Sequence, residues 1–434
     1  MKQILLVLAL LTISNLGYSQ GNWSWTRVAD LPITTSNNAF VEVISDNGKF
    51  AYSFGGISDS LTQSDIHQRV FKYSVSQDSW TEMPEIPDTS GKIASAASFV
   101  NDKIYLIGGY HVESNGTETS SNKIHIYDPS IDAFEADGSS LPIPIDGHVQ
   151  AVWRDSLIFV VTGWSNTENV PDVQIYNPEL NSWMIGTPTP NLTDYKSFGA
   201  SGYILGDTIF YYGGVIDNPI FEATNTLRKG VIDEKDPTQI EWTVISPSNG
   251  DPLYRAACSG HNKVVFWLGG SKQAYNFNAL AYYTDEPVLP NNRTINIDLE
   301  NNTQSNTFNT QNEVMDLRGI AKIGGGNWLI AGGIDSLQKA TNKTYLAHKP
   351  ELSDINTLNN PPFFKVVLTG DYFKIMTENI GEIIVYDIQG RTLFQSNKQL
   401  ADLKIPKSEL QQGILLFVYD DKVNLPLNIK KVNP

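Results

Sequence analysis

A six-fold internal repeat constrains this chain more than any other feature of its sequence. A short apolar and aromatic run that ends in glycine recurs about every 50 residues. The runs are rich in β-branched and aromatic residues, and Gly, Asn and Asp bound them, which is typical of strands. Each copy is therefore predicted to belong to one small antiparallel sheet. The six copies are Tyr52-Ser53-Phe54-Gly55-Gly56, Tyr105-Leu106-Ile107-Gly108-Gly109, Phe159-Val160-Val161-Thr162-Gly163, Phe210-Tyr211-Tyr212-Gly213-Gly214, Phe266-Trp267-Leu268-Gly269-Gly270 and Leu329-Ile330-Ala331-Gly332-Gly333.

Regularly spaced aromatic residues form a second landmark. Trp80 follows Tyr73 by seven residues and precedes Pro87 by seven. Aromatic side chains on the outer strands can fill the wedge between neighbouring sheets, so we interpret them as packing residues. The other copies are Tyr176, Trp183 and Pro190, then Tyr127, Phe134 and Pro142 with Phe134 in place of tryptophan, and a degraded version with Trp242 and Pro247.

One copy of this landmark stands out of order at the beginning of the chain. Trp25 and Pro32 precede the first glycine pair, whereas the last repeat reaches Tyr345 and has no tryptophan of its own. The simplest arrangement makes residues 23 to 31 the outer strand of the sixth sheet. The ring of sheets would then be closed and would have no free edge.

Together the glycine pairs and the spaced tyrosine and tryptophan resemble the kelch-repeat propellers. The resemblance implies an all-β fold, a six-bladed kelch-type β-propeller over residues 20 to 355. Such proteins include scaffolds, sugar-processing enzymes and oxidases, so the fold does not decide the function.

The N-terminus has the pattern of a signal peptide. Lys2 is followed by the apolar run Ile4 to Leu11 and then by Gly17-Tyr18-Ser19, whose small residues suit a signal peptidase. We expect residues 1 to 19 to be removed and the protein to be secreted or held at the cell surface. An uncleaved anchor is the alternative, but this apolar run is shorter than the roughly 20 residues that span a bilayer.

The C-terminal part has a different pattern. Residues 356 to 362 read as a polar linker, and residues 363 to 434 contain short alternating runs separated by Gly390 and Gly413, which predicts a small β-sandwich. The segments Val385 to Arg391 and Leu410 to Ile414, with the ending Lys430-Lys431, resemble the C-terminal sorting domain of the type IX secretion system. That resemblance implies the secretion machinery as a partner. An accessory sandwich packed on the propeller is the alternative.

Charge and cysteine content exclude several classes of function. The formal net charge is −16 and no cluster of Lys or Arg is visible, so a nucleic-acid partner is not expected. No stretch after the N-terminus is long enough for a transmembrane segment. Cys258 is the sole cysteine, so no intrachain disulfide can form. We interpret it as a small buried residue.

The loops that follow the glycine runs are much longer than the turns on the other face. Long loops on one face of a rigid scaffold usually carry the binding site, so we expect the ligand there, over the central channel. These loops span residues 57 to 68, 110 to 122, 164 to 171, 215 to 226, 271 to 293 and 334 to 343.

Residues at the entry of the innermost strands are predicted to point into the channel. Arg255 and Arg318 each precede a glycine pair by fourteen residues, which suggests equivalent positions. Two convergent arginines would suit a carboxylate or phosphate ligand, although each could instead hold loop carbonyls or a neighbouring Asp. The predicted channel residues are His148, Tyr195, Lys196, Tyr254, Arg255, Asp316 and Arg318.

Three aromatic or imidazole side chains directly follow the glycine runs. Tyr110, His111 and Trp164 are suited to stacking on sugar rings at a polar rim. They could equally anchor the loops.

Signatures of catalysis and of metal binding are weak. The six histidines form no pair with ligand spacing, so no metal and no cofactor are expected. Copper radical oxidases share the propeller fold but need a cysteine joined to a tyrosine and histidine ligands, which this pattern does not provide.

Two functional hypotheses follow. The first is a binding module that recognises a glycan or a protein at the channel face. The alternative is an enzyme acting on acidic sugars, similar to the kelch-type sialic acid mutarotases, with Arg255 or Arg318 on the carboxylate and His148 or Glu113 moving protons.

Overall fold

The computed structural model divides the chain into two compact units, residues 1–352 and 353–434. In the first unit the structure describes residues 23–45, 47–245, 250–299, 303–308 and 313–352. In the second it describes residues 364–369, 372–377, 381–387, 391–398, 403–406, 408, 410, 415–420 and 428–432. The predicted signal peptide, residues 1 to 19, and the predicted linker, residues 356 to 362, lie outside these ranges.

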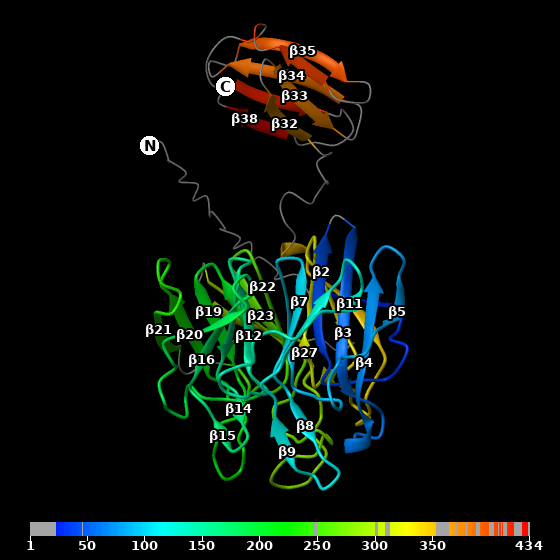
Figure 1. Ribbon diagram of the computed structural model, residues 1–434, viewed down its shortest axis with the longest axis vertical. Helices are drawn as coiled ribbons and strands as arrows, with labels where there is room; N and C mark the ends of the chain where they lie inside the picture. Colours follow the sequence, from blue (N-terminus) through cyan, green and yellow to red (C-terminus); the bar gives the residue numbers. More distant parts are fainter. Residues whose placement is uncertain are drawn as a thin grey trace, which may run out of the picture. The chain divides into compact units, whose positions relative to one another are not determined.

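The first unit is a six-bladed β-propeller, which confirms the predicted all-β propeller (Figure 1). In each blade the strands pair antiparallel in an order that follows the chain from the centre outwards, apart from the outer strand of the sixth. The blades are, in turn, β2 (Ala39–Ser45), β3 (Gly48–Ile57), β4 (Ile66–Ser74) and β5 (Ser79–Met83); β6 (Ala96–Val100), β7 (Lys103–Ile107), β10 (Ile124–Asp128) and β11 (Ala133–Phe134); β12 (Val149–Trp153), β13 (Leu157–Val161), β16 (Val173–Asn177) and β17 (Ser182–Ile185); β18 (Ser201–Leu205), β19 (Thr208–Tyr212), β20 (Leu227–Ile232) and β21 (Ile240–Ile245); β22 (Ala257–His261), β23 (Val264–Leu268), β24 (Arg293–Asp298) and β25 (Thr303–Phe308); β28 (Ala321–Gly324), β29 (Asn327–Ala331), β31 (Thr344–His348) and β1 (Ser24–Val28).

The sixth blade joins the two ends of the propeller sequence. Its outer strand β1 pairs antiparallel with β31, in a register that runs from Ser24 opposite His348 to Val28 opposite Thr344. A second link lies at the centre, where the short strand β27 (Arg318–Gly319) pairs parallel with β2 of the first blade. The ring is therefore held at its outer rim and at its axis by segments far apart in sequence.

The spaced aromatic residues are cross-strand neighbours within a blade. Tyr73 lies opposite Trp80 with ring centroids 5.1 Å apart, and Tyr127–Phe134 and Tyr176–Trp183 repeat this pair at 4.9 and 5.1 Å. The tryptophans also form hydrogen bonds to the segment that precedes their blade, through their indole N–H groups. Trp80 donates to the carbonyl of Ala29, Trp183 to that of Ser139, and Trp242 to that of Thr187. These residues both fill and bridge the space between blades.

A ring of hydrogen bonds connects the blades where the inner strands begin. One residue per blade adopts a left-handed backbone there: Asn37, Ala94, Gly147, Gly199, Arg255 and Asp316, with φ between 48° and 68°. Five of the six links join a backbone N–H group to a backbone carbonyl. The donor and acceptor pairs are Asn37 to Asp316, Gly147 to Ala94, Gly199 to Gly147, Arg255 to Gly199, and Leu317 to Arg255. The sixth link is the Ala94 N–H, which donates to the side-chain oxygen of Asn37 at 2.7 Å.

The long loops carry two small hairpins and one 3₁₀ turn. The hairpins pair β8 (Tyr110–Val112) with β9 (Glu118–Ser120) and β14 (Trp164–Ser165) with β15 (Glu168–Asn169), and the 3₁₀ turn is η1 (Gln63–Asp65). A further two-stranded sheet pairs β26 (Val314–Met315) with β30 (Ile334–Asp335), which are separated in the chain by three strands. Figure 1 shows β8–β9 and β14–β15 at the lower end of the propeller. We call this end the loop face, and the opposite end, with the tight turns between the two innermost strands of each blade, the hairpin face. A further 3₁₀ turn, η2 (Pro350–Leu352), ends the described part of the unit.

The described strands of the second unit form two antiparallel sheets. One contains β32 (Phe364–Thr369), β33 (Tyr372–Thr377) and β36 (Leu403–Pro406), and the other contains β34 (Gly381–Asp387), β35 (Thr392–Lys398), β37 (Leu415–Asp420) and β38 (Asn428–Val432). The secondary structure in the described part of this unit is therefore β as well, apart from isolated residues. Among the described residues of both units, none forms a helix with the length and hydrophobicity to cross a membrane.

Candidate functional site

The first predicted arginine is already paired inside the protein. Arg255 Nη1 lies 2.9 Å from Asp316 Oδ1, and both side chains are almost completely buried, with 3% and 0% exposed. The guanidinium also faces the rings of Tyr254 and Tyr275 at 4.9 and 5.4 Å. The same carboxylate oxygen accepts a hydrogen bond from Asn37 Nδ2 at 2.9 Å. Arg255 and Asp316 thus form an internal link between blades rather than an open anion site.

The second predicted arginine holds the backbone. Arg318 donates from Nη2 to the carbonyl of His148 at 2.9 Å, and from Nε and Nη2 to the carbonyls of Ser95 and Ala94 at 3.3 and 3.5 Å. It is not equivalent to Arg255, because Asp316 occupies the corresponding place in the ring of left-handed residues. The spacing argument was wrong by two residues, and a bulge between Lys322 and Gly324 in the sixth blade accounts for one of them.

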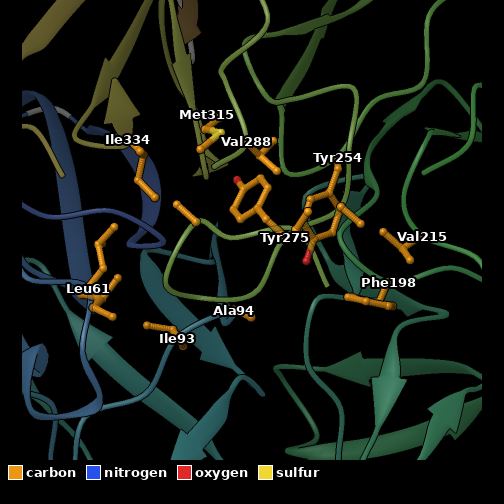
Figure 2. Packing of buried hydrophobic residues seen from close by; sticks show 14 of the residues in the cluster. Leu61, Ile93, Ala94, Phe198, Val215, Tyr254, Tyr275, Val288, Met315 and Ile334 are labelled. Atoms are coloured by element: carbon orange, nitrogen blue, oxygen red, sulfur yellow. The ribbon is translucent and has the colours of Figure 1, made fainter. Parts of the chain in front are cut away.

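The loop end of the channel is filled by apolar side chains. Figure 2 shows part of this buried cluster, including Phe198, Tyr254, Tyr275 and Met315. Tyr110 belongs to the same cluster, and the half-buried Trp164 packs against it. Tyr254 is held there by close packing, because a Cβ added to Gly199 would lie 2.0 Å from its ring. Tyr110 and Tyr254 therefore anchor the loops, and in the described part of the chain they are buried rather than lining an open site over this end of the channel.

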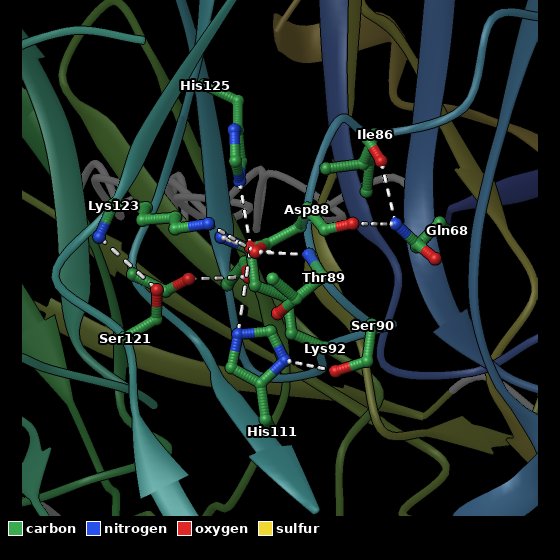
Figure 3. Close-up of polar contacts among 12 residues, drawn as sticks. Gln68, Ile86, Asp88, Thr89, Ser90, Lys92, His111, Ser121, Lys123 and His125 are labelled. Carbon is green, nitrogen blue, oxygen red and sulfur yellow. Dashed lines mark hydrogen bonds and ion pairs between the residues drawn. The ribbon is translucent and has the colours of Figure 1, made fainter.

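His111 belongs to a polar network around Asp88 (Figure 3). The buried Asp88 carboxylate lies 2.6 Å from Lys123 Nζ, 3.1 Å from His125 Nε2, 3.4 Å from Lys92 Nζ and 3.6 Å from His111 Nε2. Burial opposes ionisation of Asp88, but hydrogen bonds from His125 and Lys123 outweigh it and hold its pKa far below the ordinary value. Burial also lowers the pKa of Lys92 to about 8. Among the described residues the Lys92 ammonium has this ion pair with Asp88 but no hydrogen bond, and the network as a whole fastens the connection between the first and second blades.

Trp164 lies in an aromatic group on the loop face. Its ring centroid is 5.5 Å from that of Phe198 and 5.8 Å from that of Phe221, and Phe221 lies 5.0 Å from Tyr282. Phe221 and Tyr282 border a hollow of about 310 Å³ between the loops of the fourth and fifth blades. Tyr283, which is 72% exposed, lines the same hollow. The polar side chains in its wall are Glu222, Lys272, Gln273 and Thr284.

Two carboxyl groups near these aromatic residues, those of Asp146 and Glu118, were not predicted as site residues from the sequence. Asp146 is buried, and Ser120 Oγ donates to its carboxylate at 2.6 Å. Burial is the largest cause that raises the pKa of Asp146 to about 7, and the charge of Glu118 adds to it. Desolvation raises the pKa of Glu118 as well. Asp146 directly precedes Gly147 of the left-handed ring, so alignment of the repeats on that position would have drawn attention to it.

The remaining predicted residues do not gather at one place. Tyr195 and Lys196 are half-buried in the loop before β18, where their N–H groups donate to the carbonyl of Leu192. Glu113 is exposed in the turn between β8 and β9. His148 is buried, and burial and the charge of Arg318 lower its pKa to about 3. The proton carriers His148 and Glu113 therefore do not face a shared arginine. Within the described ranges, no group of His, Cys, Asp and Glu side chains has the arrangement of a metal site.

The family is decided by a match to a known model. The KLHDC2/KLHL20/DRC7 Kelch-repeats domain matches residues 37–270, which is more than half of the chain. The chain belongs to this kelch-repeat family. The match covers the first four blades and the two inner strands of the fifth, up to the fifth glycine pair.

Similarity to individual kelch proteins is more distant. "N-acetylneuraminate epimerase 1" of Escherichia coli O6:H1 is 26% identical over 167 residues, 38% of this chain and 42% of that protein. "Beta-scruin" of Limulus polyphemus is 24% identical over 159 residues, 35% of this chain and 16% of that protein. Human "Kelch repeat and BTB domain-containing protein 12" is 26% identical over 209 residues, 45% and 32% of the two chains. This kelch chain thus spans less than half the length of each.

A solved structure agrees on the fold. The "Structure of YjhT" superposes with a TM-score of 0.57 at 16% identity and covers 74% of this chain and 96% of that one. At this level of identity the likeness supports the propeller architecture alone.

Proposed function

We propose that the kelch propeller binds a glycan on its loop face, in the hollow between the loops of the fourth and fifth blades. The observation that carries the proposal is the aromatic group formed by Trp164, Phe221 and Tyr282, with the exposed Tyr283 beside it. Aromatic faces combined with a few polar side chains are typical of sites that hold a sugar ring. The hollow of about 310 Å³ has both kinds of group in its wall.

The backbone of this site is held in place by local interactions. Phe221 has a φ of 49°, a left-handed conformation that is uncommon for a bulky residue. Asn218 supports it, because the carbonyl of Asn218 accepts the Phe221 N–H and its side-chain oxygen accepts the N–H of Glu222 at 3.1 Å. An aromatic side chain fixed in this way loses little entropy when a ligand stacks on it.

The first prediction concerns glycan binding. On an array of glycans, the purified propeller should retain a defined set, and Tyr283→Ala should weaken binding to that set roughly three- to tenfold because a stacking face is lost. Leu180→Ala, which truncates a side chain 69% exposed elsewhere on the surface, should bind like the wild type. No retained glycan, or equal weakening in both variants, would contradict the proposal.

A second candidate is an enzyme that interconverts the anomers of an acidic sugar. Similarity to a protein named N-acetylneuraminate epimerase 1 favours it, and so does a buried carboxyl group, Asp146, whose pKa lies at about 7. A group with this pKa can take the proton of an anomeric hydroxyl, while a second acid protonates the ring oxygen as its bond to carbon breaks.

The second prediction separates this enzyme from a binding module. If Asp146 is the base, anomer exchange of N-acetylneuraminate measured by NMR should accelerate as the pH rises through about 7, because Asp146 ionises there. Asp146→Asn should abolish the acceleration. If anomer exchange proceeds at the uncatalysed rate while glycan binding is intact, the protein is a binding module and this enzymatic activity is excluded.

We also propose that residues 353–434 are an export unit, a small sandwich of the type IX sorting class, and that the protein is secreted or held at the cell surface. The support is the sequence resemblance around Val385 to Arg391 together with the two described antiparallel sheets.

The third prediction tests export in a bacterium that has a type IX secretion system. The full chain should reach the surface or the medium, whereas a chain ending at Leu352 should stay in the periplasm. Fractionation followed by immunoblotting measures both, and equal export of the two chains would contradict the assignment.

A further inference from the structure

The central channel is a blind cavity that opens on the hairpin face. The six innermost strands surround a volume of about 330 Å³. At the hairpin end its wall includes the exposed Asp155 and the half-buried Glu42, Phe99 and Tyr203. At the loop end its wall is the buried Arg318, and beyond it lies the apolar cluster that fills the loop end. In the part of the chain that the structure describes, the hairpin face therefore offers a ligand its way in.

The closed end carries a charge that the protein does not neutralise directly. Arg318 is 7% exposed, and its three hydrogen bonds all go to neutral backbone carbonyls. Among the described residues, no carboxylate lies within ion-pair distance of it, and its Nη1 atom makes no hydrogen bond. Burial and the nearby charge of Arg255 lower the pKa of Arg318 to about 10, although the more distant carboxyl groups of Asp146 and Asp316 act in the opposite direction, so it remains a cation at neutral pH. A buried, unpaired guanidinium is costly, and an anion would relieve that cost.

Uncharged polar groups surround the path to this arginine. Gln150 accepts a hydrogen bond from His148 Nε2 at 3.0 Å and donates to Ser98 Oγ at 2.8 Å, which leaves the Ser98 hydroxyl proton free to donate. The hydroxyl of Ser201, also in the channel wall, is buried and has no hydrogen-bond partner among the described residues. These hydroxyls can bond to hydroxyl groups or oxyanions of a ligand.

We propose that this channel binds a small hydroxylated carboxylic acid, whose carboxylate pairs with Arg318 and whose hydroxyls meet Ser98 and Ser201. The guanidinium supplies the planar donor geometry that a carboxylate needs. The site lies on the opposite side of the buried apolar cluster from the glycan hollow, so it does not rest on the function proposed for the loop face.

The sole cysteine provides a built-in reporter of this site. Cys258 is half-buried, lies on β22 next to β27, and lines the channel. Burial raises the pKa of its thiol, so alkylation is slow at neutral pH and is best followed at alkaline pH. A ligand that occupies the channel should slow this reaction.

The fourth prediction uses a pair of probes that differ in one group. Gluconate at millimolar concentration should slow alkylation of Cys258 in the intact protein, measured by mass spectrometry, whereas sorbitol, which has an alcohol in place of the carboxylate, should not. Arg318→Met should weaken protection by gluconate about tenfold or more, because a charge-assisted hydrogen bond is lost. Absence of protection by gluconate, or equal protection by sorbitol, would overturn the proposal.

A second variant keeps the test valid if Arg318→Met does not fold. Glu42 also lines the channel and its negative charge opposes an incoming anion, so Glu42→Gln should tighten gluconate binding roughly two- to fivefold. Glu241→Gln removes an exposed carboxylate from β21 and should change nothing. Unchanged or weaker protection in Glu42→Gln would overturn the proposal. Tyr283→Ala should leave protection intact, which distinguishes this site from the glycan hollow.

Discussion

Pairing of β1 with β31 is the constraint on which the rest of this structure depends. A propeller blade buries its faces only against its neighbours, so an open ring would leave two blades exposed and one sheet edge free. Here residues Ser24 to Val28 complete the sheet that contains Thr344 to His348. Once the ring is closed, one left-handed residue from each blade can join the circle of hydrogen bonds at the loop end, and Asn37 links the first blade to the sixth there. The closed ring fixes the positions of Arg255, Asp316 and Arg318.

Much of the fold could be predicted because a propeller repeats the same local chemistry. The glycine runs end the second strand of each blade, and residues seven apart such as Tyr73 and Trp80 become cross-strand partners. The residue count failed in the sixth blade, where Asp316 rather than Arg318 takes the place that Arg255 has in the fifth. The bulge between Lys322 and Gly324 accounts for one of the two residues of difference. Periodicity indicated the length of the loops but not the direction of their side chains. Tyr110 and Tyr254 therefore turned out to be buried, and the shifted pKa of Asp146 arises from a tertiary environment that no motif encodes.

The two buried arginines show how similar sequence contexts lead to different chemistry. Arg255 meets a carboxylate, and its charge is used to join blades. Arg318 donates its hydrogen bonds to carbonyls, and it lines the central channel. The apolar cluster between the loops separates this cavity from the aromatic hollow on the loop face. The kelch scaffold thus offers two sites of different character, one aromatic and open, the other narrow and cationic at its end.

The most direct test of ring closure is a cross-link between the first and last strands of the propeller. Thr26 lies opposite Leu346 in the register of β1 and β31, so cysteines at these two positions should oxidise to an intramolecular disulfide, detected by mass spectrometry of the non-reduced protein. Cysteines at Thr26 and Tyr345 provide the matched control, because adjacent residues of a strand point to opposite faces. Efficient cross-linking of the first pair and not of the second is the predicted result. Absence of the Thr26–Leu346 bond, or equal cross-linking of both pairs, would contradict the closed six-bladed ring.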